Sequence, residues 1–311
     1  DLQMPRKGDP LTAKEIGLLR AWIDQGALWP IDPKAAQAVH WALKPVQRPP
    51  VPTPAVASSC LVNPIDAFVL NRLESKKLTL APPADRRTFI RRLYLVMHGL
   101  PPTPEEVDLF VQDRRADAVE TLVGRVLASP RYGERWGRHW LDVARFAESN
   151  GFETNRERKN AHPYRDYVIR AFNEDLPYDQ FIKEQIAGDA FGSDAGTGFL
   201  VAGAYDIVKS PDINLTLMQR QDELADVVNT TGTAFLGLTL GCARCHDHKF
   251  DPVSQREYYQ LFAIFNNADE VDKEADRKSF NKPFLELGTP EQIAAHAVWD
   301  EQVQKARPRV A

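Results

Sequence analysis

Apolar residues recur every three to four positions along most of this chain, which is the spacing of helices that bury one face. Several of these stretches open with a capping box, in which Thr or Ser is followed three residues later by Glu, as at Thr12 and Ser254. Segments that alternate apolar and polar residues, as strands do, are scarce. The pattern therefore predicts a mainly α protein. The predicted helices cover residues 12–26, 63–73, 85–99, a segment opened by Thr103, 119–126, 130–147, 162–172, 177–188, 214–228, 254–265 and 289–310.

Proline and charge divide the chain into four parts. Residues 1–30 end in one amphipathic helix, and residues 31–60 form a Pro-rich linker, because closely spaced prolines prevent a regular helix. Residues 61–270 form the helical domain, and residues 271–311 hold a charged linker and the start of a connector helix. Within the helical domain, the glycine-rich residues 188–213 are expected to form a loop or flap.

Composition excludes two classes of partner. Lys and Arg total 39 against 43 Asp and Glu, so no basic field for nucleic acid is present. No apolar run approaches the roughly 18 residues that a membrane-spanning helix needs. The chain opens without a secretory signal, which is expected of a mature, processed or excised chain.

The most informative motif is Cys242, Cys245 and His246, which spell C-x-x-C-H. This spacing is the attachment signature of a c-type haem, in which two thiols bond the porphyrin and the imidazole binds the iron. The competing interpretation is a zinc knuckle that uses the same thiols with His246 or His248. A second C-x-x-C pair, which structural zinc sites often have, is missing. The motif therefore predicts one haem c per chain, with His246 as the proximal ligand and any additional metal ion left open.

Other polar residues are candidates for chemistry near this motif. His139 and Asp142 lie three residues apart on one predicted helix, where a carboxylate can orient an imidazole, although a partly buried His satisfied by a local carboxylate is the commoner situation. Met4-Pro5 followed by one amphipathic helix resembles the tail of a class I cytochrome c, which makes Met4 a candidate distal ligand of an upstream haem, and Cys60 is expected to be a free thiol. The candidate polar or catalytic cluster comprises Asp142, Arg145, Asp222, Glu223, Asp247, His248 and Asp251.

Several stretches together resemble planctomycete-type cytochrome c proteins. They include "NPIDAFVLNRLESKKL", "SPRYGERWGRHWLDVARFAESNGFE", "RQDELADVV" and "FLGLTLGCARCHDHKFDPVSQREYYQLFAIFNN". The resemblance covers about residues 1–270 and implies a periplasmic or otherwise extracytoplasmic setting. It also implies that residues 1–30 are the tail of a class I cytochrome c-like domain and that a third domain follows. The chain is thus expected to be a fragment whose partners include those two missing domains.

The resemblance implies a function in electron transfer linked to polysaccharide breakdown, with a redox partner and a carbohydrate context. His139 is the preferred sixth ligand of the iron, because His248 lies too close to His246 in sequence to reach the opposite haem face. Two alternatives stay open. One is a haem enzyme that acts on a sugar through the polar cluster, and the other is a haem-stapled scaffold that binds carbohydrate.

Overall fold

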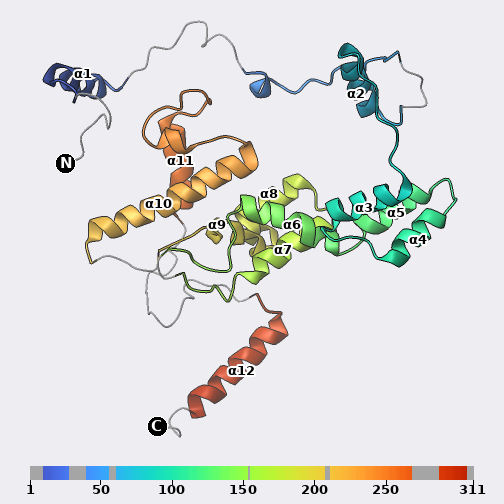
Figure 1. The fold of residues 1–311 in the computed structure, drawn as a ribbon. Helices are drawn as coiled ribbons and strands as arrows, with labels where there is room; N and C mark the ends of the chain where they lie inside the picture. The colour runs from blue at the N-terminus through green and yellow to red at the C-terminus, as the bar shows by residue number, and fades with distance from the viewer. Residues whose placement is uncertain are drawn as a thin grey trace. The chain divides into compact units, whose positions relative to one another are not determined.

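The computed structural model describes residues 10–27, 40–55, 61–152, 155–206, 211–267 and 287–306. It separates into two compact units, Asp1–Ala84 and Asp85–Ala311. Within the described ranges the regular structure is helical, and the β-type pairing there is a bridge between Ser149 and Glu157 (Figure 1). The prediction of a mainly α protein is therefore confirmed. None of the helices in these ranges is long and apolar enough to cross a membrane.

The first unit contains helices α1 (Ala13–Asp24) and α2 (Pro64–Ser75), with a short 3₁₀ turn between them. Both helices begin as predicted, because Thr12 closes a capping box on α1 and Asn63 caps α2. The predicted apolar face of α2 is wrong. Ile65 is 71% exposed, and α2 instead buries Ala67 and Leu70.

The second unit begins with a three-helix group. Tyr94 and Phe110 are among the buried residues that join these helices, and Tyr94 donates a hydrogen bond of 2.8 Å to Glu106. Asp85 caps the first helix and Thr103 closes a capping box on the second, so local signals define where both begin. The three helices are α3 (Arg86–Met97), α4 (Pro104–Gln112) and α5 (Ala118–Leu127).

The next helices pack closely through glycine. Gly133 on α6 (Arg131–Val143) lies so near α7 (His162–Asn173) that an added Cβ would sit 2.3 Å from the Ile169 carbonyl oxygen. Asn173 also accepts a 2.8 Å hydrogen bond from the Gly133 amide and donates one of 3.2 Å to the Pro130 carbonyl. A side chain of α7 therefore caps the start of α6, where Pro130 offers no cap of its own.

The segment after α8 (Tyr178–Ala187) corrects two expectations. Up to residue 206 it is not an open flap, because η3 (Gly188–Phe191), η4 (Asp194–Thr197) and α9 (Gly198–Val201) all pack on α8. Phe199 is fully buried, and Gly198 lies directly against Tyr164. The helix predicted over residues 130–147 also ends early, at Val143, because Arg145 adopts a left-handed backbone with φ of 59°.

The last part of the second unit holds the C-x-x-C-H motif. Its long helix α10 (Ile213–Thr231) continues into a π-helical turn, Gly232–Leu236, and the motif follows in the 3₁₀ turn η6 (Gly241–Arg244). Helix α11 (Gln255–Phe265) packs on α10 and η6, and together they bury a core. Its members are Leu224, Val228, Leu240, Ala243, Tyr258, Phe262 and Phe265. Helix α12 covers Pro290–Ala306, and the rest of its predicted span lies outside the described residues.

Candidate functional site

The two motif cysteines occupy one edge of a short turn. Residues three apart eclipse each other in a 3₁₀ helix, so η6 and its cap bring Cys242 and Cys245 to the same side. Both thiols are exposed and free, and no disulfide joins them. Ala243 between them is fully buried in the core of α10 and α11. The turn thus anchors through its apolar residue and presents both sulfur atoms outward.

Arg244 fixes this turn between two helices. Its guanidinium Nη2 lies 2.8 Å from Oδ1 of Asp222 on α10. Its carbonyl oxygen accepts hydrogen bonds from the Tyr259 hydroxyl at 3.0 Å and from Gln255 Nε2 at 3.3 Å, both on α11. Asp222, predicted as a member of the polar cluster, therefore orients the motif. The hydrogen bond to Asp222 raises the pKa of Arg244, which stays charged at neutral pH.

His246 is exposed and presents one ring nitrogen for binding. Its Nδ1 lies 2.8 Å from the Asp247 carbonyl oxygen, so Nδ1 carries the proton and donates. This tautomer leaves Nε2 unprotonated and available as a ligand. A backbone carbonyl on Nδ1 is the arrangement that orients metal-binding histidines in proteins.

Three further members of the predicted polar cluster hold the loop that follows the motif. Asp247 Oδ1 accepts a 2.8 Å hydrogen bond from the backbone amide of Gln255, the first residue of α11. His248, whose side chain is 7% exposed, accepts at Nδ1 from the backbone amides of Asp251 at 2.8 Å and Phe250 at 3.3 Å. Asp251 Oδ2 accepts from the Thr239 hydroxyl at 3.4 Å. Asp247 and His248 thus satisfy backbone amides and Asp251 pairs with a side-chain hydroxyl, and together these contacts fix the course of the loop.

The remaining predicted residues lie on other elements. His139 on α6 is exposed and meets the Trp136 ring edge-on at 5.7 Å, and Asp142 is exposed further along the same helix. Helix α6 packs mainly on α7 and α3, whereas η6 packs on α11 and α10. The structure therefore does not gather His139 and Asp142 with the motif. Met4 and Cys60 lie outside the described residues.

Arg145 connects the α6 side of the unit to α10. Its guanidinium forms an ion pair with Asp226, which stands one turn after Asp222, while Glu223 lies beside Asp222 on α10. Burial lowers the pKa of Arg145 to about 10, so it remains a cation at neutral pH. Successive turns of α10 thus bind two arginines: Asp222 pairs with Arg244 of the motif, and Asp226 pairs with Arg145 after α6. Asp226 was not predicted from the sequence, although its spacing of four residues from Asp222 is the signal that would have identified it.

The residues at the motif fit covalent attachment of a haem. Two free thiols face one side of the turn, and the imidazole beside them offers Nε2. Tyr258 adds a buried hydroxyl that has no hydrogen-bond partner in the described part of the chain. Burial is the main cause that raises the pKa of Tyr258, and the charges of Tyr259 and Cys245 add to it. Phe250, 81% exposed, provides apolar surface in the same loop.

A zinc knuckle fits less well. A tetrahedral site needs four ligands that converge on one point. Within the described ranges no three His, Cys, Asp or Glu side chains come together in a way that could hold a metal ion. His248, which a knuckle could use as a further ligand, accepts two backbone amides at Nδ1, so this ring nitrogen is not available to a metal.

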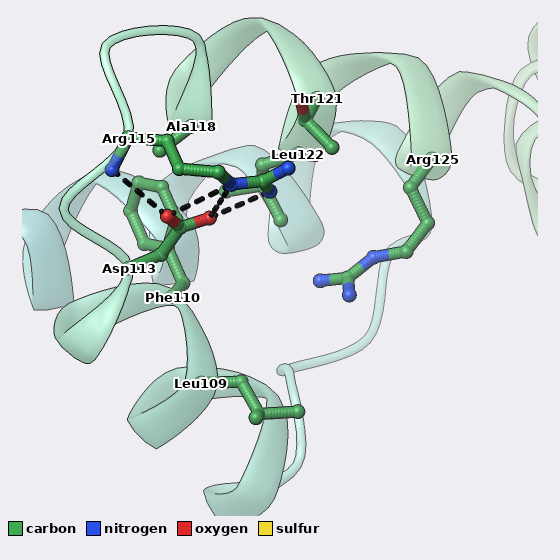
Figure 2. A pocket seen from close by; sticks show the side chains of 8 residues that line it. All are labelled: Leu109, Phe110, Asp113, Arg115, Ala118, Thr121, Leu122 and Arg125. Carbon is green, nitrogen blue, oxygen red and sulfur yellow. Dashed lines mark hydrogen bonds and ion pairs between the residues drawn. The ribbon is translucent and has the colours of Figure 1, made fainter.

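A separate hollow of about 330 Å³ lies between α4 and α5 (Figure 2). Leu109 and Phe110 line one part of it, and Asp113, paired with Arg115 at 2.8 Å, lines another. Arg125 extends into the same space from α5 (Figure 2). None of the sequence-predicted site residues lines this hollow.

Comparison with known proteins gives a family and no function. No curated protein and no solved structure matches the chain. One family model matches residues 64–270, a range that nearly coincides with the helical domain expected over residues 61–270 and includes the C-x-x-C-H motif. Because that match covers more than half of the chain, the protein belongs to the PSCyt2 family, described as a protein of unknown function (DUF1549).

Proposed function

We propose that this chain is an extracytoplasmic c-type haem protein that transfers electrons. The observation that carries the proposal is the motif itself, in which two free, exposed thiols are followed directly by an exposed imidazole whose Nε2 is available. Cys242 and Cys245 would hold the haem through thioethers, and His246 would be its proximal ligand. When bound, the haem supplies a one-electron iron couple.

The surrounding residues support a rigid site. Ala243 is buried beneath the turn, and Arg244 holds it to α10 through Asp222 and to α11 through Tyr259 and Gln255. A site held on two helices changes little between oxidation states, which favours fast electron transfer because less reorganisation accompanies each step. The carbohydrate context comes from the resemblance to planctomycete-type cytochrome c proteins and is part of the proposal.

The alternative of a sugar-cleaving enzyme gains no support from these contacts. Its expected acid–base groups are already hydrogen-bonded: Asp247 and His248 accept backbone amides, and Asp251 accepts from the Thr239 hydroxyl. Asp222 is paired with Arg244. A general acid or base needs a group within hydrogen-bond reach of a substrate proton, and these groups are already engaged by the protein.

The first test is the covalent haem. The full chain is produced in a bacterium that attaches haem to exported proteins, and the purified protein is extracted with acidified acetone. We expect a Soret band that stays with the protein, weakened in Cys242→Ala and Cys245→Ala and lost in the double variant. Cys60→Ala is the matched control and should keep the band unchanged. A colourless protein, or a haem that extracts completely, would refute the proposal.

The second test separates electron transfer from ligand chemistry. We expect the reduced protein to exchange electrons rapidly with a small redox mediator and to show no spectral shift under carbon monoxide. A carbon monoxide shift in the wild-type protein would mean an exchangeable sixth position and would favour the enzyme. Binding to a panel of insoluble polysaccharides tests the carbohydrate context, and retention of the holoprotein by one of them is the expected result.

A further inference from the structure

The first half of α10 exposes several apolar side chains, and it leads into Asp222, which contacts the motif. Met218 is 52% exposed, and Leu215 and Leu217 are also exposed, as is Ile213 at the start of the helix. The buried residues of α10 in the core shared with α11 come from its second half, beginning at Leu224. Figure 1 shows α10 as a long helix whose first half continues past α11. In the described part of the chain, these apolar side chains are therefore exposed on the helix that contacts the motif turn.

Helical register brings Met218 to the side of α10 that meets the motif. Asp222 faces η6, because its Oδ1 lies 2.8 Å from Arg244 within the C-x-x-C-H sequence. Residues four apart lie one above the other on a helix, so Met218 stands on the same face as Asp222, one turn earlier. One turn before the residue that contacts the motif, α10 therefore carries the thioether side chain of Met218.

Met218 has the chemistry of a sixth iron ligand. A thioether is a soft, neutral ligand that pairs with histidine in many cytochromes c and raises their potential. Met97 packs against the core of α3, α4 and α5, and His139 is on α6. His248 uses Nδ1 to accept two backbone amides. Among the Met and His residues just compared, Met218 alone stands both exposed and in register with a contact to the motif.

We infer that Met218 supplies its sulfur as the second axial ligand of the haem iron, in place of His139. This inference rests on the proposed haem attachment. Leu215, three residues before Met218, is exposed on the same side of α10 and would add apolar contact to the bound haem. The first half of α10 is then one wall of the cofactor site, and Asp222 ties that wall to the attachment turn.

The test is optical spectroscopy of the oxidised holoprotein and its variants. Iron–thioether ligation gives a weak charge-transfer band at the red end of the visible spectrum. We expect this band in the wild type, its loss in Met218→Leu together with a lower midpoint potential, and a new carbon monoxide response in the reduced variant. Met97→Leu, a conservative change of a packed methionine, is the matched control and should keep the band. His139→Ala should also keep it.

The outcomes separate this inference from the proposed function. If the wild type carries covalent haem and Met218→Leu has an unchanged spectrum, the inference is wrong while the haem proposal stands. If the wild type carries no covalent haem, the haem proposal fails and the inference fails with it. Met218→His is the second variant, in case Met218→Leu does not fold. It should replace the thioether spectrum with that of two imidazole ligands, and an unchanged spectrum would again overturn the inference.

Discussion

Replacement of Gly133 by Ala tests the close contact between α6 and α7. An Ala Cβ at this position would sit 2.3 Å from the Ile169 carbonyl oxygen and 2.6 Å from Asn173 Cγ. Real Cβ atoms do not approach a backbone oxygen so closely, so α6 and α7 must separate. Movement of the Asn173 side chain cannot relieve the contact, because the Ile169 oxygen belongs to the backbone.

The expected change in the free energy of unfolding combines two losses and one gain. Overpacking of a close contact costs about 1–3 kcal/mol. Separation of the helices also weakens the 2.8 Å hydrogen bond from the Gly133 amide to Asn173, which contributes about 1 kcal/mol. Ala is favoured over Gly in a helix by about 1 kcal/mol, which offsets part of the loss. We therefore expect Gly133→Ala to lower the free energy of unfolding by about 1–3 kcal/mol.

Gly124→Ala is the matched control, because it makes the same change within α5. No atom lies within 4 Å of the Cβ that this substitution would add. Only the helix preference then acts, and the free energy of unfolding should rise by up to about 1 kcal/mol. The two variants should thus differ by about 2–4 kcal/mol, with the intrinsic preference for Ala cancelling between them.

The assay is urea unfolding of both variants and the wild type, followed by tryptophan fluorescence and circular dichroism. Changes in midpoint at constant denaturant slope report stability alone. Thermal unfolding gives a second reading, with about 2–4 °C expected per kcal/mol for a unit of this size. A midpoint for Gly133→Ala equal to or above that of Gly124→Ala would refute the close contact between α6 and α7.

Three further predictions address single side chains. The hydrogen bond from Arg115 lowers the pKa of Asp113 to about 2. The stability that this pair provides is therefore present above pH about 4 and is lost as the pH falls toward about 2. In Arg115→Gln, carboxyl titration by NMR should show a higher pKa for Asp113, and an unchanged value would contradict this pairing. Tyr258→Phe removes a buried hydroxyl that has no hydrogen-bond partner in the described structure. It should raise the unfolding free energy of the haem-free protein, measured by urea unfolding, by about 1 kcal/mol. A lower unfolding free energy would instead reveal a hydrogen bond to this hydroxyl. Asp222→Ala breaks a largely exposed pair with Arg244 and should cost less than about 1 kcal/mol by the same method, since solvent screens such pairs.

Local signals predicted where most helices begin. The capping boxes at Thr12, Thr103 and Ser254 are present, each with its Glu three residues on. These signals can be read from sequence because a cap and its helix amide are only a few residues apart, so the hydrogen bond forms with little loss of chain entropy. The spacing of Cys242, Cys245 and His246 is equally local. The two cysteines lie on one short turn and its cap, and His246 follows directly.

Apolar periodicity was less reliable where a helix could bury either of two faces. On α2 the larger side chains Ile65 and Phe68 are exposed, and Ala67 and Leu70 are buried. On α6 the contact with α7 is made through Gly133, a residue that carries no hydrophobic signal. Which face is buried depends on the shape of the partner helix, and that partner is far away in the sequence.

The sequence by itself therefore determined the helical class, most helix starts and the C-x-x-C-H spacing of the two cysteines and the histidine. Only the tertiary structure decided which polar residues stand beside that turn. Asp222 and Asp226 acquire their roles from Arg244 and Arg145, which approach α10 from different parts of the chain. His139 remains on another helix for the same reason. Contacts within a few residues follow from local geometry, whereas contacts between distant segments depend on how whole helices pack.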